Sequence, residues 1–169
     1  MDMEAPLMAT IKTSGIEIFS KQLETLSKEI SNINSMALYD GAGVVADAIG
    51  NALKGLPVRG DEEWGSSKWK LYGATESEKQ QLAENFGISR FQKGFGSVQT
   101  SVGFTGYVNT PSSRFNNQVP TGMLMQCIEY GTEFRWGTHT VTAAINKCRS
   151  KAEAAMKGRV EKEINELTK

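Results

Sequence analysis

Residues 123–140, MLMQCIEYGTEFRWGTHT, decide how the middle of the chain is joined to its carboxy-terminal part. Apolar side chains recur at helical spacing up to Tyr130, and Gly131 is a natural carboxy-terminal cap, so the first part predicts a short helix. Residues 133–137 are expected to be extended, and a further helix is predicted to begin at Thr140. The stretch is therefore interpreted as a corner that sets the last helix against the rest of the fold.

Apolar residues recur at helical spacing both before and after this corner in the sequence. After it, residues 140–167 keep one apolar face through their whole length, while the outward positions are rich in Lys, Arg and Glu. Near the amino end, residues 16–30 carry a narrow apolar stripe, introduced by a capping box from Ser14 to Glu17. This stripe consists of Ile16, Phe19, Leu23, Leu26 and Ile30. It is expected to pack against the rest of the fold, with a short coiled-coil seam as the alternative.

Residues 35–55 predict a second helix that has a different composition. A glycine inside a helix costs up to about 1 kcal/mol relative to alanine, so the glycines here need a compensating contact. The small residues of this segment are Gly41, Ala42, Gly43 and Ala46. They let another backbone approach closely, which favours a tightly packed helix that ends at Gly55 and Pro57.

Residues 58–97 are interpreted as an elaboration within a single domain that spans residues 1–169. The first part of the elaboration is polar and rich in charged residues, glycine and serine, so it predicts a loop. Trp64 and Trp69 punctuate that loop and are expected either to hold it in place or to meet a partner.

A capping box and an alternating segment predict the regular structure that follows. Thr75 and Glu78 have the spacing of a capping box and predict a short helix, closed at Gly87. Residues 98–105 alternate apolar and polar side chains, which is typical of a strand with one buried face. These two elements place regular structure in the middle of the chain.

The strand at residues 98–105 needs at least one partner strand. Since it is the only clear strand, less obvious segments such as 8–13 and 132–137 are expected to supply the partner. Residues 109–121 are rich in proline, asparagine and serine and predict a loop. The predicted fold is therefore α+β, with amino-terminal helices and a long carboxy-terminal helix packed on a small antiparallel sheet.

The composition argues against several broad classes of protein. The chain has 169 residues with equal numbers of basic and acidic residues, so no bulk charge points to nucleic acid or to an anionic membrane. The basic positions of the last helix alternate with glutamates, and no helix-turn-helix pattern is evident, so sequence-specific nucleic-acid recognition is not expected. No apolar run reaches the length of about 20 residues that a membrane span requires.

The residues that could carry chemistry are few and poorly placed. His139 is the only histidine, and no carboxylate or cysteine cluster has metal-ligand spacing. Cys127 and Cys148 both fall on apolar helix faces, so they are interpreted as small core side chains. Glu129 and Glu133 flank a turn without a second polar cluster to form a cleft. No catalytic, cofactor-binding or metal site is expected, and the protein is predicted not to be an enzyme.

Several segments, taken in order, resemble a family of tailed bacteriophages. These segments are GAGVVADAIGNALKGLPV at 41–58, ATESEKQQLAENFGISRF at 74–91, VGFTGY at 102–107 and NNQVPTGMLMQCIEYGT at 116–132, followed by the long last helix. Together they resemble the head–tail joining family, also called the neck or tail-completion family, over roughly residues 10–160. One departure is that Arg135 to Val141 reads RWGTHTV, without the proline that family members often have before the final helix.

The resemblance implies a structural role in the virion. Such a protein is expected to form a homo-oligomeric ring of like subunits, a hexamer or dodecamer, at the head–tail junction of a particle assembled in the cytoplasm of a bacterial host. Its partners would be the head connector or adaptor and a tail-tube or tail-terminator protein, and DNA can pass through the ring. The candidate contact residues are Trp64, Trp69, Phe115, Tyr130, Arg135 and Trp136.

Other readings stay open at this point. Within the virion class, a tail terminator that caps the tail tube has the same sequence features as a joining protein. A non-virion assembly factor or another small binding module is the alternative outside it. The isolated subunit is expected to be a monomer that oligomerises on its partner.

Overall fold

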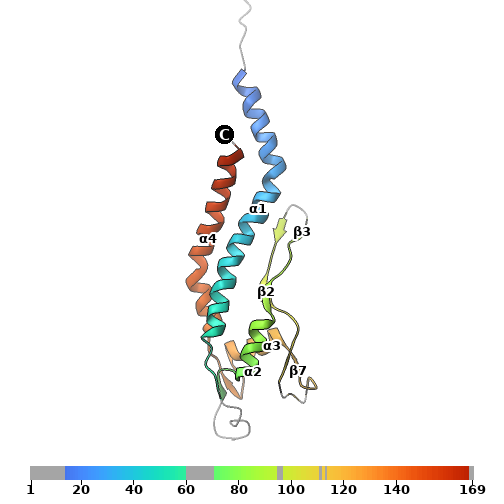
Figure 1. The fold of residues 1–169 in the computed structure, drawn as a ribbon, viewed down its shortest axis with the longest axis vertical. Helices are drawn as coiled ribbons and strands as arrows, with labels where there is room; N and C mark the ends of the chain where they lie inside the picture. Colours follow the sequence, from blue (N-terminus) through green and yellow to red (C-terminus); the bar gives the residue numbers. More distant parts are fainter. Residues whose placement is uncertain (1–13, 60–70, 95–96, 111, 113, 168–169) are drawn as a thin grey trace, which may run out of the picture.

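The computed structural model describes residues 14–59, 71–94, 97–110, 112 and 114–167. Two long helices form an elongated antiparallel pair, and a compact end of short helices and strands lies at its base (Figure 1). The helices α1 (Ser14–Lys54) and α4 (Thr140–Leu167) make up the pair, and α2 (Glu76–Glu84) and α3 (Thr121–Tyr130) lie in the compact end. The α+β class with a long helix at each end is confirmed.

The prediction of two separate amino-terminal helices was wrong, because α1 is one continuous helix of 41 residues. The polar residues between the two predicted helices include no proline or glycine, so nothing there forces a break. Ile33 and Ala37, which lie in and just after this stretch, are buried. Burial of the inner face keeps the helix intact across its polar outer face.

The middle of α1 packs closely on α4, as its small residues predicted. A Cβ atom added at Gly41 would lie 2.6 Å from Cγ of Met156 and 3.6 Å from the carbonyl oxygen of Ala152, which is buried. Beside this contact the guanidinium of Arg159 donates to the carboxylate of Asp40 at 2.6 Å. The hydrogen-bonded ion pair and the close backbone approach fix the register of the two helices.

The amino-terminal turns of α1 extend past the end of α4 (Figure 1). The prediction that their apolar stripe packs against the rest of the fold was wrong for Phe19, Leu23 and Ile30, each of which is half exposed or more. The capping box at Ser14 and Glu17, together with Ile16, falls outside the described side chains.

The compact end contains the hydrophobic core. Its buried residues are Ile49, Leu53, Leu56, Ala74, Leu82, Val108, Val119, Leu124, Met125 and Ile128. The predicted capping box of α2 is confirmed, since Thr75 accepts a hydrogen bond from the Glu78 amide and Glu78 accepts one from the Thr75 amide. The helix ends at Glu84 with Asn85 as its cap, however, and Gly87 lies in the strand that follows.

The strands are short and pair two by two. The pairs are β2 (Phe86–Ile88) with β5 (Val102–Phe104), β3 (Gln92–Gly94) with β4 (Ser97–Gln99), β6 (Tyr107–Asn109) with β7 (Gln118–Pro120), and β1 (Leu71–Tyr72) with β8 (Arg135–Trp136). The first three pairs are antiparallel and the last is parallel.

The predicted pairing of residues 132–137 with the strand at 98–105 was wrong. The expected strand at residues 98–105 is divided between β4, which pairs with β3, and β5, which pairs with β2. The segment at 132–137 pairs with β1 instead, and residues 8–13 lie outside the described part. The expected loop at 109–121 contains β7, because it folds back on β6 as a hairpin.

Candidate functional site

The corner that follows α3 displays aromatic side chains on one side and buries a charge on the other. Side chains alternate along β8, so Arg135 points inward while Trp136 points outward. Phe134, in the turn before β8, is also exposed and borders the pocket described below. Trp136 is paired in register with Tyr72 of β1. Tyr72, Phe134 and Trp136 are each more than half exposed.

Tyr130 lies at the start of the same corner and is also more than half exposed. Gly131 has a φ of 81°, and a Cβ atom there would lie 2.8 Å from the amide nitrogen of Gly137, so only glycine lets the two arms of the corner come this close. The ring of Tyr130 lies 6.2 Å from that of His139, centroid to centroid. We call Tyr72, Tyr130, Phe134 and Trp136 the aromatic surface.

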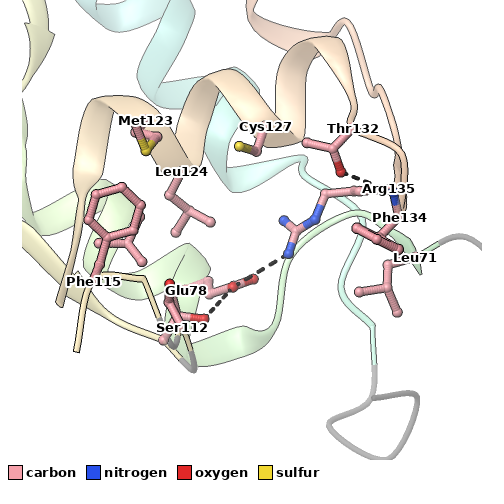
Figure 2. A pocket seen from close by; sticks show the side chains of 12 residues that line it. Leu71, Glu78, Ser112, Phe115, Met123, Leu124, Cys127, Thr132, Phe134 and Arg135 are labelled. Carbon is pink, nitrogen blue, oxygen red and sulfur yellow. Dashed lines mark hydrogen bonds and ion pairs between the residues drawn. The ribbon is translucent and has the colours of Figure 1, made fainter. Parts of the chain in front are cut away.

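A pocket of about 360 Å³ lies on the inner side of the corner. Apolar side chains from several segments form its walls (Figure 2): Leu71, Phe115, Val119, Met123, Leu124, Cys127 and Phe134. The polar groups that line it include Glu78, Thr110, Thr132 and Arg135. It is therefore an apolar pocket with a charged group at its base.

The charged base of the pocket belongs to a buried cluster around Glu78, whose side chain is 2% exposed. One carboxylate oxygen, Oε1, accepts a hydrogen bond from the Thr110 hydroxyl at 2.9 Å and lies 3.5 Å from Arg135 Nη2. The other, Oε2, accepts from the Thr75 amide at 3.0 Å and lies 3.7 Å from Arg59 Nη2. One capping carboxylate therefore holds together α2, the segment that follows α1, and the corner.

A second buried carboxylate, Glu129, fixes the start of α4. It accepts hydrogen bonds from the backbone amides of Val141 at 3.0 Å and Thr142 at 2.6 Å. These are orphan amides of the first helical turn, so Glu129 does what a capping residue does, from the end of α3. The start of α4 is thus joined to the corner through Glu129, in a stretch that contains no proline.

The hydrogen bonds lower the pKa of Glu129 below its usual value of 4.5. Burial by itself would raise this pKa, because it penalises the charged form. Hydrogen bonds from the Thr142 side chain and from the Thr142 and Val141 amides, together with the nearby His139, outweigh that effect. Glu129 is therefore a structural carboxylate that remains ionised at neutral pH.

The predicted contact residues fall in three different settings. Tyr130 and Trp136 lie on the aromatic surface, and Phe115 is half-buried in the pocket wall. Arg135 is only 8% exposed, so it belongs to the buried cluster and the pocket and not to the surface. Trp64 and Trp69 lie outside the described residues.

Sequence reasoning missed Tyr72, Phe134 and Glu78. The alternation of Phe134, Arg135 and Trp136 was a usable signal, since one residue of the three had to face inward. Glu78 gave no such signal, because a capping-box glutamate is ordinarily solvated. The cluster depends on two arginines that are far from Glu78 in the sequence.

Among the residues that the structure describes, no three His, Cys, Asp or Glu side chains lie together in a way that could hold a metal ion. His139 is exposed and Cys148 is buried on the apolar face of α4. Over the same residues, no helix is both long and apolar enough to cross a membrane. Comparison with protein-family models, curated sequences and solved structures returned no match.

Proposed function

We propose that this protein is a structural component of a tailed-phage or prophage-derived particle, where it forms a ring that joins the head to the tail or completes the tail. The sequence supports this proposal through four segments that, in their order along the chain, resemble the neck and tail-completion family. All four contribute to described elements, from the close contact of α1 with α4 to the corner after α3.

The observation that carries the proposal is the aromatic surface. Large aromatic side chains that are exposed together mark protein–protein contacts, and tyrosine and tryptophan are the residues that most often dominate binding energy there. Tyr72 and Trp136 are held side by side by strand pairing, and the closely packed glycine corner fixes Tyr130. A rigid aromatic group loses little conformational entropy when a neighbouring subunit covers it.

The elongated helix pair gives the subunit a second exposed region. The apolar residues Phe19, Leu23 and Ile30, in the amino-terminal half of α1, are each half exposed or more. A subunit with apolar groups at both ends can contact neighbours through two different surfaces. Two different surfaces make a head-to-tail contact, and such a contact closes into a ring when its rotation permits.

Mass spectrometry of purified particles that carry this gene tests the proposal. We expect the chain in complete particles at several copies each, and we expect particles without it to separate into heads and tails. If the chain is absent from complete particles but its loss still impairs particle assembly, the protein is a non-virion assembly factor and the proposal is wrong. Tails of uncontrolled length in particles without the chain would identify a tail terminator.

A further inference from the structure

The pocket beneath the corner contains a buried hydrogen-bond donor without an acceptor. Nη1 of Arg135 is buried and has no hydrogen-bond partner among the described residues. In Figure 2 the guanidinium lies between Cys127 and Glu78 and points into the space that the pocket residues enclose. Buried donors are nearly always satisfied in proteins, so this one points to a ligand.

The interaction with Glu78 leaves a donor of the Arg135 guanidinium available to an anion. The Nη2 of Arg135 lies 3.5 Å from Oε1 of Glu78, whereas a charge-assisted hydrogen bond measures about 2.7–2.9 Å. The same oxygen already accepts a closer hydrogen bond, at 2.9 Å, from Thr110. A carboxylate that entered the pocket could therefore take Nη1 without displacing an existing bond.

The lining of the pocket indicates which chemical groups accompany the carboxylate of an occupant. Leu71, Phe115 and Met123 give the pocket an apolar lining, so its occupant must carry apolar groups next to its acidic group. The volume of about 360 Å³ suits a few amino-acid side chains. The matching chemistry is a short peptide segment in which acidic and apolar residues alternate.

The chain contains such a segment outside the described residues. Residues 2–8 read DMEAPLM, in which Asp2 and Glu4 alternate with methionine and alanine and are followed by Pro, Leu and Met. This segment precedes α1, whose first turn lies at the far end of the helix pair from α2 and α3 (Figure 1). The pocket residues Glu78 and Leu124 belong to these two short helices. Its charge and its apolar groups both complement the pocket.

The length of α1 shows whose pocket the segment can reach. Leu53, near the carboxy end of α1, belongs to the same core as the pocket residue Leu124. The 41 residues of α1 span about 60 Å at 1.5 Å per residue. Glu4 precedes Ser14 by ten residues, which extend at most about 36 Å. The pocket of its own subunit is therefore out of reach.

We propose that the pocket receives the amino-terminal segment of a second copy of this chain, with a carboxylate of Asp2 or Glu4 accepting a hydrogen bond from Arg135 Nη1. This inference rests on the proposed self-assembly and names one contact between like subunits. The contact is weak for free subunits and is reinforced in a ring, where neighbouring subunits raise the effective concentration of the segment.

A labelled peptide of residues 1–13 tests the contact on the full-length protein. Fluorescence anisotropy is expected to show saturable binding below about 1 mM peptide. The neutral peptide, with Asp2→Asn and Glu4→Gln, is expected to bind about tenfold more weakly or worse, because a charge-assisted hydrogen bond is lost. Equal binding of the two peptides, or no binding of the acidic one, would overturn the proposal.

Two variants of α3 place the binding at the pocket. Cys127→Phe fills the pocket and is expected to weaken peptide binding about tenfold or more, whereas Gln126→Phe adds the same ring on the exposed face and leaves it unchanged. Equal affinity of both variants would place the peptide elsewhere and refute the contact.

Thiol modification gives an independent measurement on the unaltered protein. Cys127 lines the pocket and is partly exposed, while Cys148 is buried and serves as the internal reference. Saturating acidic peptide is expected to slow modification of Cys127 by a maleimide several-fold, and an unchanged rate would contradict the contact. Negative results in these peptide experiments would refute this contact but not ring formation, which mass spectrometry of the particles tests separately.

Discussion

The carboxylate of Glu129 offers a quantitative test of how the last helix is held. Glu129→Gln keeps the shape of the side chain and one acceptor oxygen but removes the charge and the second acceptor. The two oxygens accept from Val141 and Thr142 at 3.0 and 2.6 Å, at the positive end of the α4 dipole. Hydrogen bonds to charged groups contribute about 1.5–3 kcal/mol each, so we expect a loss of about 2–3 kcal/mol in the free energy of unfolding.

The pH dependence follows from the direction of the pKa shift. The pKa of Glu129 is lowered in the folded protein, so its contribution is complete above the usual value of 4.5 and is lost as the pH falls through the folded pKa. Urea denaturation of the wild type and the Gln variant should therefore differ by about 2–3 kcal/mol at about pH 7. The difference should shrink as the pH falls from about 5 toward 2.

Glu133→Gln is the matched control, because Glu133 is an exposed carboxylate four residues away. Its effect is expected to stay within about 0.5 kcal/mol, as for most surface substitutions. Two results would refute the reasoning about the corner. One is a Glu129→Gln loss no larger than that of the control, and the other is a loss that stays the same at low and neutral pH.

Three further substitutions test other parts of the account. The free energy of unfolding, measured by heat or urea, should be about 1–3 kcal/mol lower for Gly41→Ala than for Gly43→Ala. Only the first substitution inserts a methyl group into the α1–α4 contact, so equal stabilities would contradict that close packing. Glu78→Gln should lower the free energy of unfolding by about 3–5 kcal/mol, because it removes the buried carboxylate that faces Arg135 and Arg59. A loss as small as that of exposed Glu76→Gln would contradict the cluster. Trp136→Ser should leave the melting temperature within about 2 °C but reduce incorporation into particles several-fold, and full incorporation would remove the aromatic surface from the account.

The helices were largely predictable because their signals are local. The capping box of α2, the glycine that ends α3 and the periodic face of α4 each depend on residues within a few turns of one another. The continuity of α1 was missed because the polar residues 31–35 resemble a connection. Ile33, within this stretch, is buried, and a lone helix could not bury it, so the signal that keeps α1 continuous is not local.

The strands and the buried charges could not be predicted from local pattern. Ladders of two or three residues are too short for alternation to show which segment pairs with which. Arg59 and Arg135 come together on Glu78 only after the chain has folded around α2. For the same reason, Arg135 looked like a surface contact residue in the sequence although its side chain is buried.

The most direct measurement of the central claim is a cryo-electron microscopy map of the neck of particles that contain this chain. The account predicts a closed ring of like subunits in which Tyr72, Tyr130, Phe134 and Trp136 of each copy are covered by a neighbouring protein. A map in which the chain is present but these four side chains face solvent would contradict the account, and so would a neck that lacks the chain.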